Sequence, residues 1–244
     1  MHSFLFKYRF GDCMKKLICV LLSCFLFVSM LCGCDNDDKE RKKEIQQYRD
    51  AKTASYIEEN NRYEDYEVDV AFLGDSLTDL YDVQTYYPQY LVSNRGIGGD
   101  TTVDLEDRLQ VSLYDLKPKI AVMLIGANNI ETMFYNYERI LKGFQETVPN
   151  TKIILLSLTS MSGEWGKKNH IAAYNNVKIK MLAEKYSFEY VDLYSALFNL
   201  ESGEIFPQYT TDGGHLTAAG YQVLTEQITP VIDLQMAAWK SENP

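Results

Sequence analysis

Short apolar runs alternate with helix-like stretches along most of this chain, and this alternation constrains the fold more than any other feature of the sequence. The apolar runs are predicted strands at residues 68–73, 90–93, 119–125, 152–158 and 188–193. Amphipathic helices are predicted between them, at about residues 101–113, 133–147, 168–186 and 217–229. Strands and helices in strict alternation predict right-handed crossovers and a parallel sheet covered by helices.

Two of the predicted strands contain stretches that are apolar at every position, at residues 120–125 and 153–156. A strand has this composition when both of its faces are buried. The sequence therefore predicts an α/β fold, a three-layer α/β/α sandwich with a five-stranded parallel sheet of the flavodoxin-like kind. One such domain over residues 63–244 accounts for most of the chain.

The first 34 residues differ in composition from everything that follows. Two lysines, Lys15 and Lys16, precede an apolar stretch over residues 17–31, which is the pattern of a secretory signal. All five cysteines lie in this segment, so a disulfide-stabilised scaffold is excluded for the remaining residues. The end of the stretch, Cys32-Gly33-Cys34, resembles a bacterial lipobox.

That resemblance implies a signal peptide with lipobox over residues 1–34 and lipidation of Cys34, which becomes the mature N-terminus. The protein is then expected to be exported as a membrane-anchored lipoprotein that faces the periplasm or the cell exterior. An uncleaved anchor is the alternative, because residues 17–34 fall just short of the ~20 residues of a spanning helix. Either Met1 or Met14 can serve as the start, and Met14 gives the cleaner signal.

Residues 35–62 are charged and contain neither proline nor glycine, as in a solvated tether. A weak apolar stripe from about residue 44 to residue 60 predicts a helix that is either marginal or loosely docked, so the tether is expected to be partly helical. The formal net charge of the whole chain is −10, which argues against nucleic acid or anionic lipid headgroups as the main partner.

Polar residues follow three of the predicted strands, and a fourth polar stretch lies near the C-terminal end. These stretches are residues 74–77 (Gly-Asp-Ser-Leu), 94–102 (Asn-Arg-Gly-Ile-Gly-Gly-Asp-Thr-Thr), 126–129 (Gly-Ala-Asn-Asn) and 212–215 (Asp-Gly-Gly-His). In parallel sheets the carboxyl ends of the strands share one edge, where ligands bind. Hydrolysis by a serine needs a nucleophile, a base, an orienting group for the base and donors for the oxyanion, and these stretches contain all four.

The four stretches resemble the sequence blocks of the GDSL/SGNH hydrolase superfamily in their order and spacing, over about residues 66–230. The resemblance implies that Ser76 is the nucleophile and that His215 is its general base. It implies that Asp212 orients the imidazole and stabilises the imidazolium. No cofactor and no metal is implied.

The same resemblance implies an oxyanion hole formed by the backbone N–H groups of Ser76 and Gly99 and the side-chain amide of Asn128. Asp75 and Asn94 are expected to shape the two loops behind these donors. Asn129 stands where many members have Asp, which marks a subgroup.

Other interpretations exist for each stretch taken alone. Ser76 could be only the N-cap of the helix that follows. Asp212 and His215 could belong to a metal site, although no other histidine or cysteine joins them. The glycines of residues 96–99 are similar to a dinucleotide-binding loop but lack its third glycine at the required spacing.

The sequence therefore predicts a serine esterase that acts through an acyl-enzyme on a small-molecule or glycan ester. A short acyl group such as acetyl on a carbohydrate is favoured, because the chain has no long apolar insertion or lid. A lysophospholipase or thioesterase is the first alternative, and an inactive glycan-binding module, which would lack a triad residue, is the second. Trp165, His170 and Tyr209 lie near these loops in roles that the sequence leaves open.

Overall fold

The computed structural model describes residues 35–243, so the predicted signal peptide and the predicted lipidation site Cys34 lie outside the described residues. Contact density divides the chain into two compact units, one ending at Tyr48 and one beginning at Arg49. The second unit contains the sheet and the site described below. Within residues 35–243, no helix is both long enough and apolar enough to cross a membrane.

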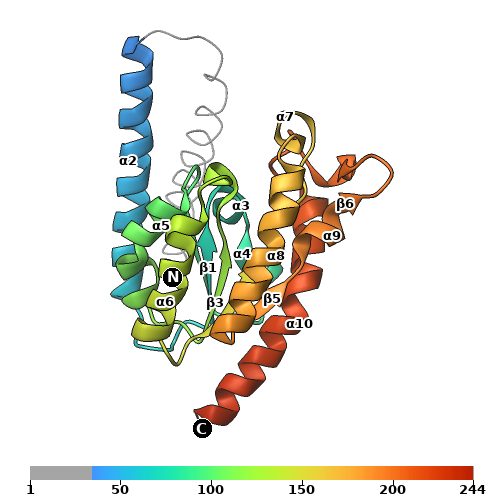
Figure 1. Cartoon of the computed structure of the whole chain (residues 1–244). Coiled ribbons are helices and arrows are strands. Elements are labelled where there is room, and N and C mark those ends of the chain that lie inside the picture. The colour runs from blue at the N-terminus through green and yellow to red at the C-terminus, as the bar shows by residue number, and fades with distance from the viewer. Residues whose placement is uncertain (1–34, 244) are drawn as a thin grey trace, which may run out of the picture. The chain divides into compact units, whose positions relative to one another are not determined.

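A five-stranded parallel sheet forms the centre of the second unit (Figure 1). The strands are β1 Val70–Gly74, β2 Val92–Gly96, β3 Ile120–Leu124, β4 Lys152–Leu156 and β5 Glu189–Val191. They lie in the order β2-β1-β3-β4-β5, and each neighbouring pair is parallel. Gly74 is in register with Gly96 on one side and with Leu124 on the other. The segments that follow β1, β2 and β3 therefore leave the sheet at the same level.

Helices cover both faces of the sheet and confirm the predicted three-layer α/β/α sandwich (Figure 1). The helices are α2 Asp35–Asn60, α3 Ser76–Asp79, α4 Val83–Tyr86, α5 Thr102–Asp107, α6 Phe134–Thr147, α7 Gly163–Gly166, α8 Asn169–Tyr186, α9 Leu193–Leu197 and α10 Ala218–Glu242. Shorter turns are the π-helical η1 Gln110–Tyr114 and the 3-10 turns η2 Ala127–Asn129 and η3 Pro207–Tyr209, and a two-stranded hairpin joins β6 Phe198–Asn199 to β7 Glu204–Ile205.

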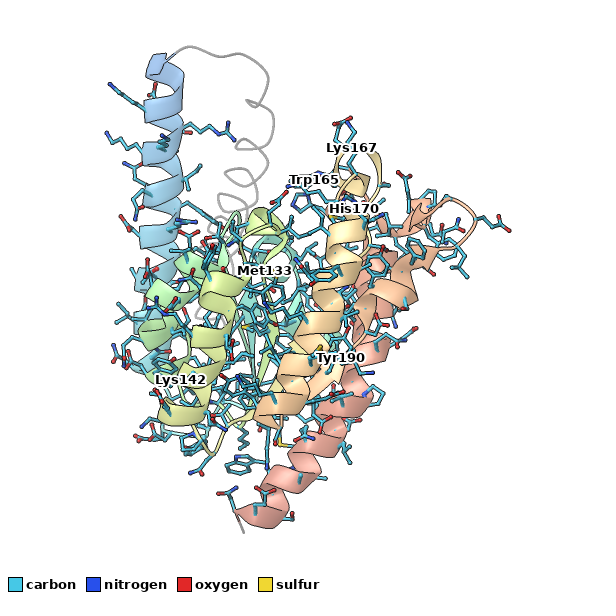
Figure 2. All side chains as sticks on the ribbon, viewed as in Figure 1. Met133, Lys142, Trp165, Lys167, His170 and Tyr190 are labelled. Carbon is cyan, nitrogen blue, oxygen red and sulfur yellow. The ribbon has the colours of Figure 1, made fainter. Side chains whose placement is uncertain are left out.

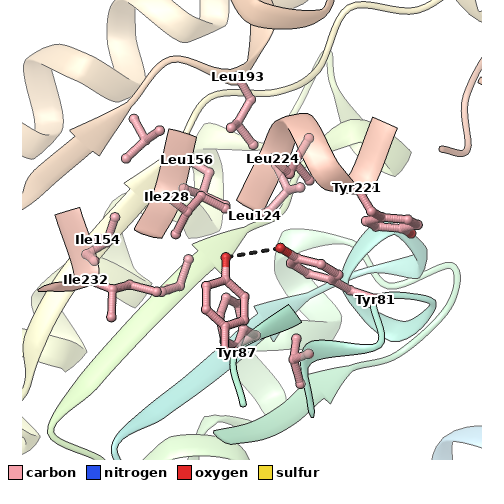
Figure 3. Close-up of a cluster of buried hydrophobic side chains, with 14 of the residues drawn as sticks. Tyr81, Tyr87, Leu124, Ile154, Leu156, Leu193, Tyr221, Leu224, Ile228 and Ile232 are labelled. Atoms are coloured by element: carbon pink, nitrogen blue, oxygen red, sulfur yellow. Dashed lines mark hydrogen bonds between the residues drawn. The ribbon is translucent and has the colours of Figure 1, made fainter. Parts of the chain in front are cut away.

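The core divides between the two faces because side chains alternate along each strand. On one face, Val122 of β3 belongs to a buried cluster with Leu224 and Ile228 of α10. Figure 3 shows part of this cluster, in which the hydroxyl of Tyr81 donates to that of Tyr87 at 3.0 Å. On the other face, Met123 of β3 belongs to a second cluster, with side chains from α5, α6 and α8.

Two predicted helices differ from the observed ones. The helix expected over residues 101–113 ends at Asp107 and resumes as the π-helical turn η1, because Arg108 between them turns its guanidinium into the interior. The helix expected over residues 217–229 continues as α10 to Glu242 with Pro230 inside it. Burial of Ile228 and Ile232 on either side of the proline holds the helix against the sheet across this point.

The last turns of α2 belong to the second unit, which begins inside the segment predicted as a tether. Tyr56 is 2% exposed, and its hydroxyl donates to the carbonyl of Gly96 at 2.7 Å. At the C-terminal end of the helix, the amide of Asn60 donates to the carbonyl of Val111 at 2.8 Å. The expectation of a loosely docked helix was wrong because one aromatic ring and a few polar contacts replace a continuous apolar stripe.

Candidate active site

Ser76 is the first residue of α3, directly after β1. The N-cap of this helix is Asp75, whose carboxylate accepts from the backbone N–H of Leu77 at 3.1 Å. Ser76 is therefore not the capping residue, and its hydroxyl is available for chemistry at the edge of the sheet. The close approach of α3 to β2 requires glycine at position 96, because a Cβ there would lie 2.2 Å from the backbone nitrogen of Asp79.

A tight loop before α10 presents Asp212 and His215. One carboxylate oxygen of Asp212 accepts from the backbone N–H groups of Gly214 at 2.9 Å and His215 at 2.7 Å. Gly213 has a φ of +91°, a conformation that L side chains rarely adopt. The loop is also tied to the segment after β4, because Ser162 donates its N–H to the carbonyl of Gly213 at 2.9 Å.

The loop and α3 bring three of the predicted residues into one line. His215 Nε2 lies 3.0 Å from Ser76 Oγ, and His215 Nδ1 lies 2.7 Å from the second carboxylate oxygen of Asp212. These are hydrogen-bond distances for a nucleophile, a base and an orienting group. The carboxylate at Nδ1 favours the tautomer whose Nε2 lone pair faces the serine.

The electrostatics of the loop keep Asp212 ionised. Partial burial acts to raise the pKa of Asp212, but the N–H and the ring of His215 outweigh it, so the pKa lies below its ordinary value. An ionised Asp212 stabilises positive charge on His215, as a general base requires when it takes up a proton.

The predicted oxyanion donors lie on the loop after β2 and on the turn after β3. Gly99 is exposed and has a φ of +81°, so its backbone conformation suits glycine. A Cβ on the preceding Gly98 would lie 4.0 Å from Cβ of Ser76, so this loop runs beside the nucleophile. The amide of Asn128 donates one hydrogen to the carbonyl of Asp100 at 2.9 Å, which leaves its second N–H for a ligand oxygen.

Asn94 connects the end of β2 to the segment that follows β1. Its amide donates to the carbonyls of Thr78 at 2.6 Å and Tyr81 at 2.9 Å, and its oxygen accepts from the N–H of Gly96 at 2.8 Å. The turn that carries Ser76 is thus fixed against the end of β2.

Asn129 has a structural explanation in this chain. Its oxygen accepts from the N–H of Thr102 at 3.3 Å, and its amide donates to the hydroxyl of Thr102 at 2.9 Å. An amide can both accept and donate here, whereas an ionised Asp could only accept. Asn129 therefore joins the start of α5 to the turn that carries Asn128.

Sequence reasoning missed a group of buried charges behind the loop after β2. Asp100 is 1% exposed and accepts from Arg108 Nε at 2.7 Å. The same guanidinium donates to the carbonyls of Gly74 and Arg95, both at 2.9 Å. Arg108 thereby joins the ends of β1 and β2 to the loop that carries Gly99. No local sequence pattern marks such a cluster, because its members are far apart in the chain.

Three further residues considered from the sequence have different surroundings. Trp165 in α7 packs beside the histidine loop, since a Cβ on Gly214 would lie 3.0 Å from its indole nitrogen. His170 lies near the N-terminal end of α8 (Figure 2) and is exposed. Tyr209 is partly buried against the core beneath α10. Over residues 35–243, no three histidine, cysteine or acidic side chains are grouped to hold a metal ion.

Comparison with known families gives one match. A family model described as GDSL-like lipase/acylhydrolase matches residues 72–223, which is more than half of the chain. No curated protein matches the chain. The matched residues include Ser76, Gly99, Asn128, Asp212 and His215.

Solved structures share the fold. A protein from Streptococcus pneumonia, named provisionally as a platelet activating factor, is 24% identical over 82% of this chain and 100% of its own, with a TM-score of 0.74. A GDSL-like lipase from Bacteroides thetaiotaomicron is 23% identical over 74% of this chain and 97% of its own, with a TM-score of 0.65. A variant of Axe2, an acetylxylan esterase from Geobacillus stearothermophilus, is 23% identical over 69% of this chain and 95% of its own, with a TM-score of 0.56.

Proposed function

The chain belongs to the GDSL-like lipase/acylhydrolase family, and from that premise we propose that it is an esterase that removes a short acyl group, acetyl above all, from a carbohydrate. The proposed reaction rests on one observation, the hydrogen-bonded series Ser76, His215 and Asp212. His215 Nε2 lies 3.0 Å from Ser76 Oγ, and His215 Nδ1 lies 2.7 Å from a carboxylate oxygen of Asp212.

In the proposed reaction, Ser76 Oγ attacks the ester carbonyl carbon while His215 Nε2 takes the hydroxyl proton. The negative charge that develops on the carbonyl oxygen is stabilised by the N–H groups of Ser76 and Gly99 and by the amide of Asn128. When the tetrahedral intermediate collapses, the bond to the alcohol oxygen breaks and His215 returns the proton to that oxygen.

Water completes the cycle. It attacks the acyl-enzyme carbonyl while His215 removes one of its protons, and the acid leaves as Ser76 regains its proton. In each half of the reaction His215 therefore acts first as a proton acceptor and then as a proton donor.

The surroundings of Ser76 favour a short acyl group. A long acyl chain needs apolar surface, at about 0.8 kcal/mol for each buried methylene. The segments beside the nucleophile supply little of it: Gly99 and Asn128 are exposed, and the side chain of Asp212 is 40% exposed. An acetyl group requires no such surface.

A carbohydrate alcohol is supported by the aromatic residue beside the histidine loop. The half-buried indole of Trp165 packs at Gly214, next to the base, and indole and phenol rings are amphipathic surfaces. Solved proteins with the same fold include one named as an acetylxylan esterase.

An acyl-length series on 4-nitrophenyl esters tests the acyl group, and acetylated xylo-oligosaccharides test the alcohol. We expect kcat/KM to peak at acetyl and acetate to be released from the glycan. A peak at long chains would instead support the lysophospholipase or thioesterase alternative.

Ser76→Ala tests the nucleophile. We expect loss of turnover and of fluorophosphonate labelling with the fold unchanged by circular dichroism. Ser195→Ala is the matched control, because Ser195 is an exposed serine in α9 whose backbone N–H and hydroxyl both donate to Asp192. Turnover retained by Ser76→Ala would reject the mechanism, and an unlabelled wild-type protein would favour a glycan-binding module.

Export as a lipoprotein rests on the sequence and is part of the same proposal. Metabolic labelling with a fatty acid analogue, followed by membrane fractionation, tests it. We expect Cys34→Ser to abolish labelling and Cys32→Ser to leave it intact; labelling that survives Cys34→Ser would reject Cys34 as the site.

A further inference from the structure

The last turns of α2 lie outside the matched family region, and they carry two cations toward the loop that holds Gly99. Arg49 Nη1 donates to Asp104 at 2.6 Å, and its Nη2 lies 3.0 Å from Asp100. Lys52 Nζ lies 2.7 Å from Asp79. Arg49 and Lys52 are three residues apart, so both project from one side of the helix.

The carboxylates that these cations bind lie on the two sides of the Gly98-Gly99 turn. Asp79 uses its second oxygen to accept from the N–H of Gly98 at 2.9 Å. Asp100 follows Gly99 directly, and its carbonyl accepts from the amide of Asn128 at 2.9 Å. Arg49 is therefore linked through the side chain of Asp100 to the residue that follows Gly99. Lys52 is linked through the carboxylate of Asp79 to the N–H of Gly98, the residue before Gly99.

The contact between Arg49 and Asp100 compensates a buried charge. Asp100 is 1% exposed, and burial raises the pKa of its carboxyl. One of its oxygens accepts from Arg108 at 2.7 Å, and the other lies 3.0 Å from Nη2 of Arg49. Without Arg49, no cation would lie within hydrogen-bond distance of this buried oxygen. We would then expect the loop to move so that the oxygen of Asp100 reaches water.

We infer that Arg49 and Lys52 are positioning residues for catalysis: through Asp100 and Asp79 they hold the Gly98-Gly99 turn so that the Gly99 N–H and the Asn128 amide converge on one oxygen. The inference rests on the oxyanion hole of the proposed mechanism, and it is independent of the acyl group and the alcohol. It also gives the segment between the predicted signal and the catalytic domain a part in turnover.

A role confined to stability predicts something different. The interface between α2 and the rest of the unit also contains Tyr56 and Asn60, whose side chains donate to the backbone carbonyls of Gly96 and Val111. Loss of a general docking contact lowers the free energy of unfolding and leaves turnover by the folded protein unchanged. Loss of a positioning contact lowers kcat in protein that is still folded, because misplaced donors stabilise the transition state less.

The test uses the full chain and 4-nitrophenyl acetate. Arg49→Met removes the guanidinium and keeps the length of the side chain. We expect kcat to fall about 10- to 100-fold with KM changed less than about two-fold, and fluorophosphonate labelling to slow by a similar factor. Arg49→Lys keeps the charge and is expected to restore a substantial part of kcat.

Two control variants separate positioning from stability. Asn60→Ala removes a docking contact of the same helix, and Arg139→Met removes a surface ion pair with Glu106 at 2.8 Å. Both are expected to keep the wild-type kcat, and Asn60→Ala to lower the melting temperature. If Arg49→Met does not fold, Lys52→Met takes its place with the same expectation.

The outcomes are distinct. A folded Arg49→Met or Lys52→Met protein with wild-type kcat overturns the inference, as does an equal loss of kcat in Asn60→Ala. Wild-type protein that neither turns over the ester nor reacts with the fluorophosphonate would instead overturn the proposed mechanism.

Discussion

In the proposed mechanism, the hydrogen bond between Asp212 and His215 sets the tautomer of the base and stabilises the positive charge that the base acquires. Asp212→Asn keeps the size of the side chain but replaces a carboxylate by a neutral amide. We expect kcat to fall by about 10²- to 10⁴-fold with little change in KM, because the loss concerns the imidazolium and not substrate binding. Steady-state kinetics with 4-nitrophenyl acetate measure this.

Asp192→Asn is the matched control for that substitution. Asp192 also accepts from the backbone N–H of a residue three positions on, Ser195, but it caps α9 away from the catalytic residues. The Asp192→Asn variant should keep wild-type kcat. Equal losses of kcat in the two variants would contradict the role proposed for Asp212.

Asp75, behind the nucleophile, makes the stability of the fold depend on pH. Burial raises the pKa of Asp75 to about 7, against about 3.9 for an exposed aspartate. Between those values the folded protein binds more protons than the unfolded chain, so the free energy of unfolding decreases as pH rises from about 4 to about 7, and Asp75 adds no further slope above that range.

Asp75→Asn tests this dependence. Asparagine can still accept from the N–H of Leu77 but does not ionise. The melting temperature of the variant relative to wild type should therefore rise from pH 4 to pH 7 and then level off. If the difference in melting temperature between the variant and wild type does not change with pH, ionisation of Asp75 does not destabilise the folded protein and the prediction is wrong.

The residues of the proposed mechanism could be named from the sequence, and the buried charges that hold their loops could not. Ser76 and His215 stand in short blocks whose order along the chain matches a known family. Arg49 and Arg108 are charged residues in ordinary polar stretches, where a solvated face is the usual interpretation, and Asp100 lies in the block of residues 94–102 without a predicted role of its own. Their importance comes from burial and from partners far away in sequence, which no local pattern records.

At the scale of elements, α10 contains the most unusual feature, a proline in the middle of a long helix. Pro230 has no N–H for the carbonyl four residues earlier and lowers helix stability by about 3 kcal/mol in an isolated helix. Its fixed φ also restricts the unfolded chain, which offsets part of that cost.

Pro230→Ala is therefore expected to raise the free energy of unfolding by about 1–2 kcal/mol without changing kcat. Urea unfolding at constant pH measures it. A loss of stability would mean that packing of Ile228 and Ile232 depends on a bend that the proline produces.

Two of the long helices lie close to their predicted ranges, whereas the shortest strands were not predicted. Helices α6 and α8 were expected at 133–147 and 168–186 and are found at Phe134–Thr147 and Asn169–Tyr186. The hairpin of β6 and β7 was not expected, because strands of two residues are too short to show alternation. The strand expected over 188–193 is shorter because Asp192 caps α9.

At the scale of the whole molecule, the α/β/α class followed from strand composition and strict alternation, but the extent of the compact unit did not. The unit begins at Arg49, and residues 49–60 cover Arg95, which is fully buried. The Arg95 guanidinium lies 4.8 Å from the centre of the Tyr56 ring, donates to the Tyr56 carbonyl at 3.3 Å and lies 3.5 Å from Glu59. A single aromatic residue in a charged stretch gives little sequence signal for such docking.

A chain that starts at residue 63, where the domain was expected to begin, should consequently be impaired, whereas one that starts at residue 35 should not. The shorter chain exposes the surface that Tyr56 buries and removes partners of Arg95, for a loss of about 2–4 kcal/mol in the free energy of unfolding. It also lacks Arg49 and Lys52, so we expect lower kcat even below its melting temperature. Adding a synthetic peptide of residues 35–62 should restore both stability and turnover, and equal melting temperature and kcat in the two chains would contradict a role for this helix in the fold and in catalysis alike.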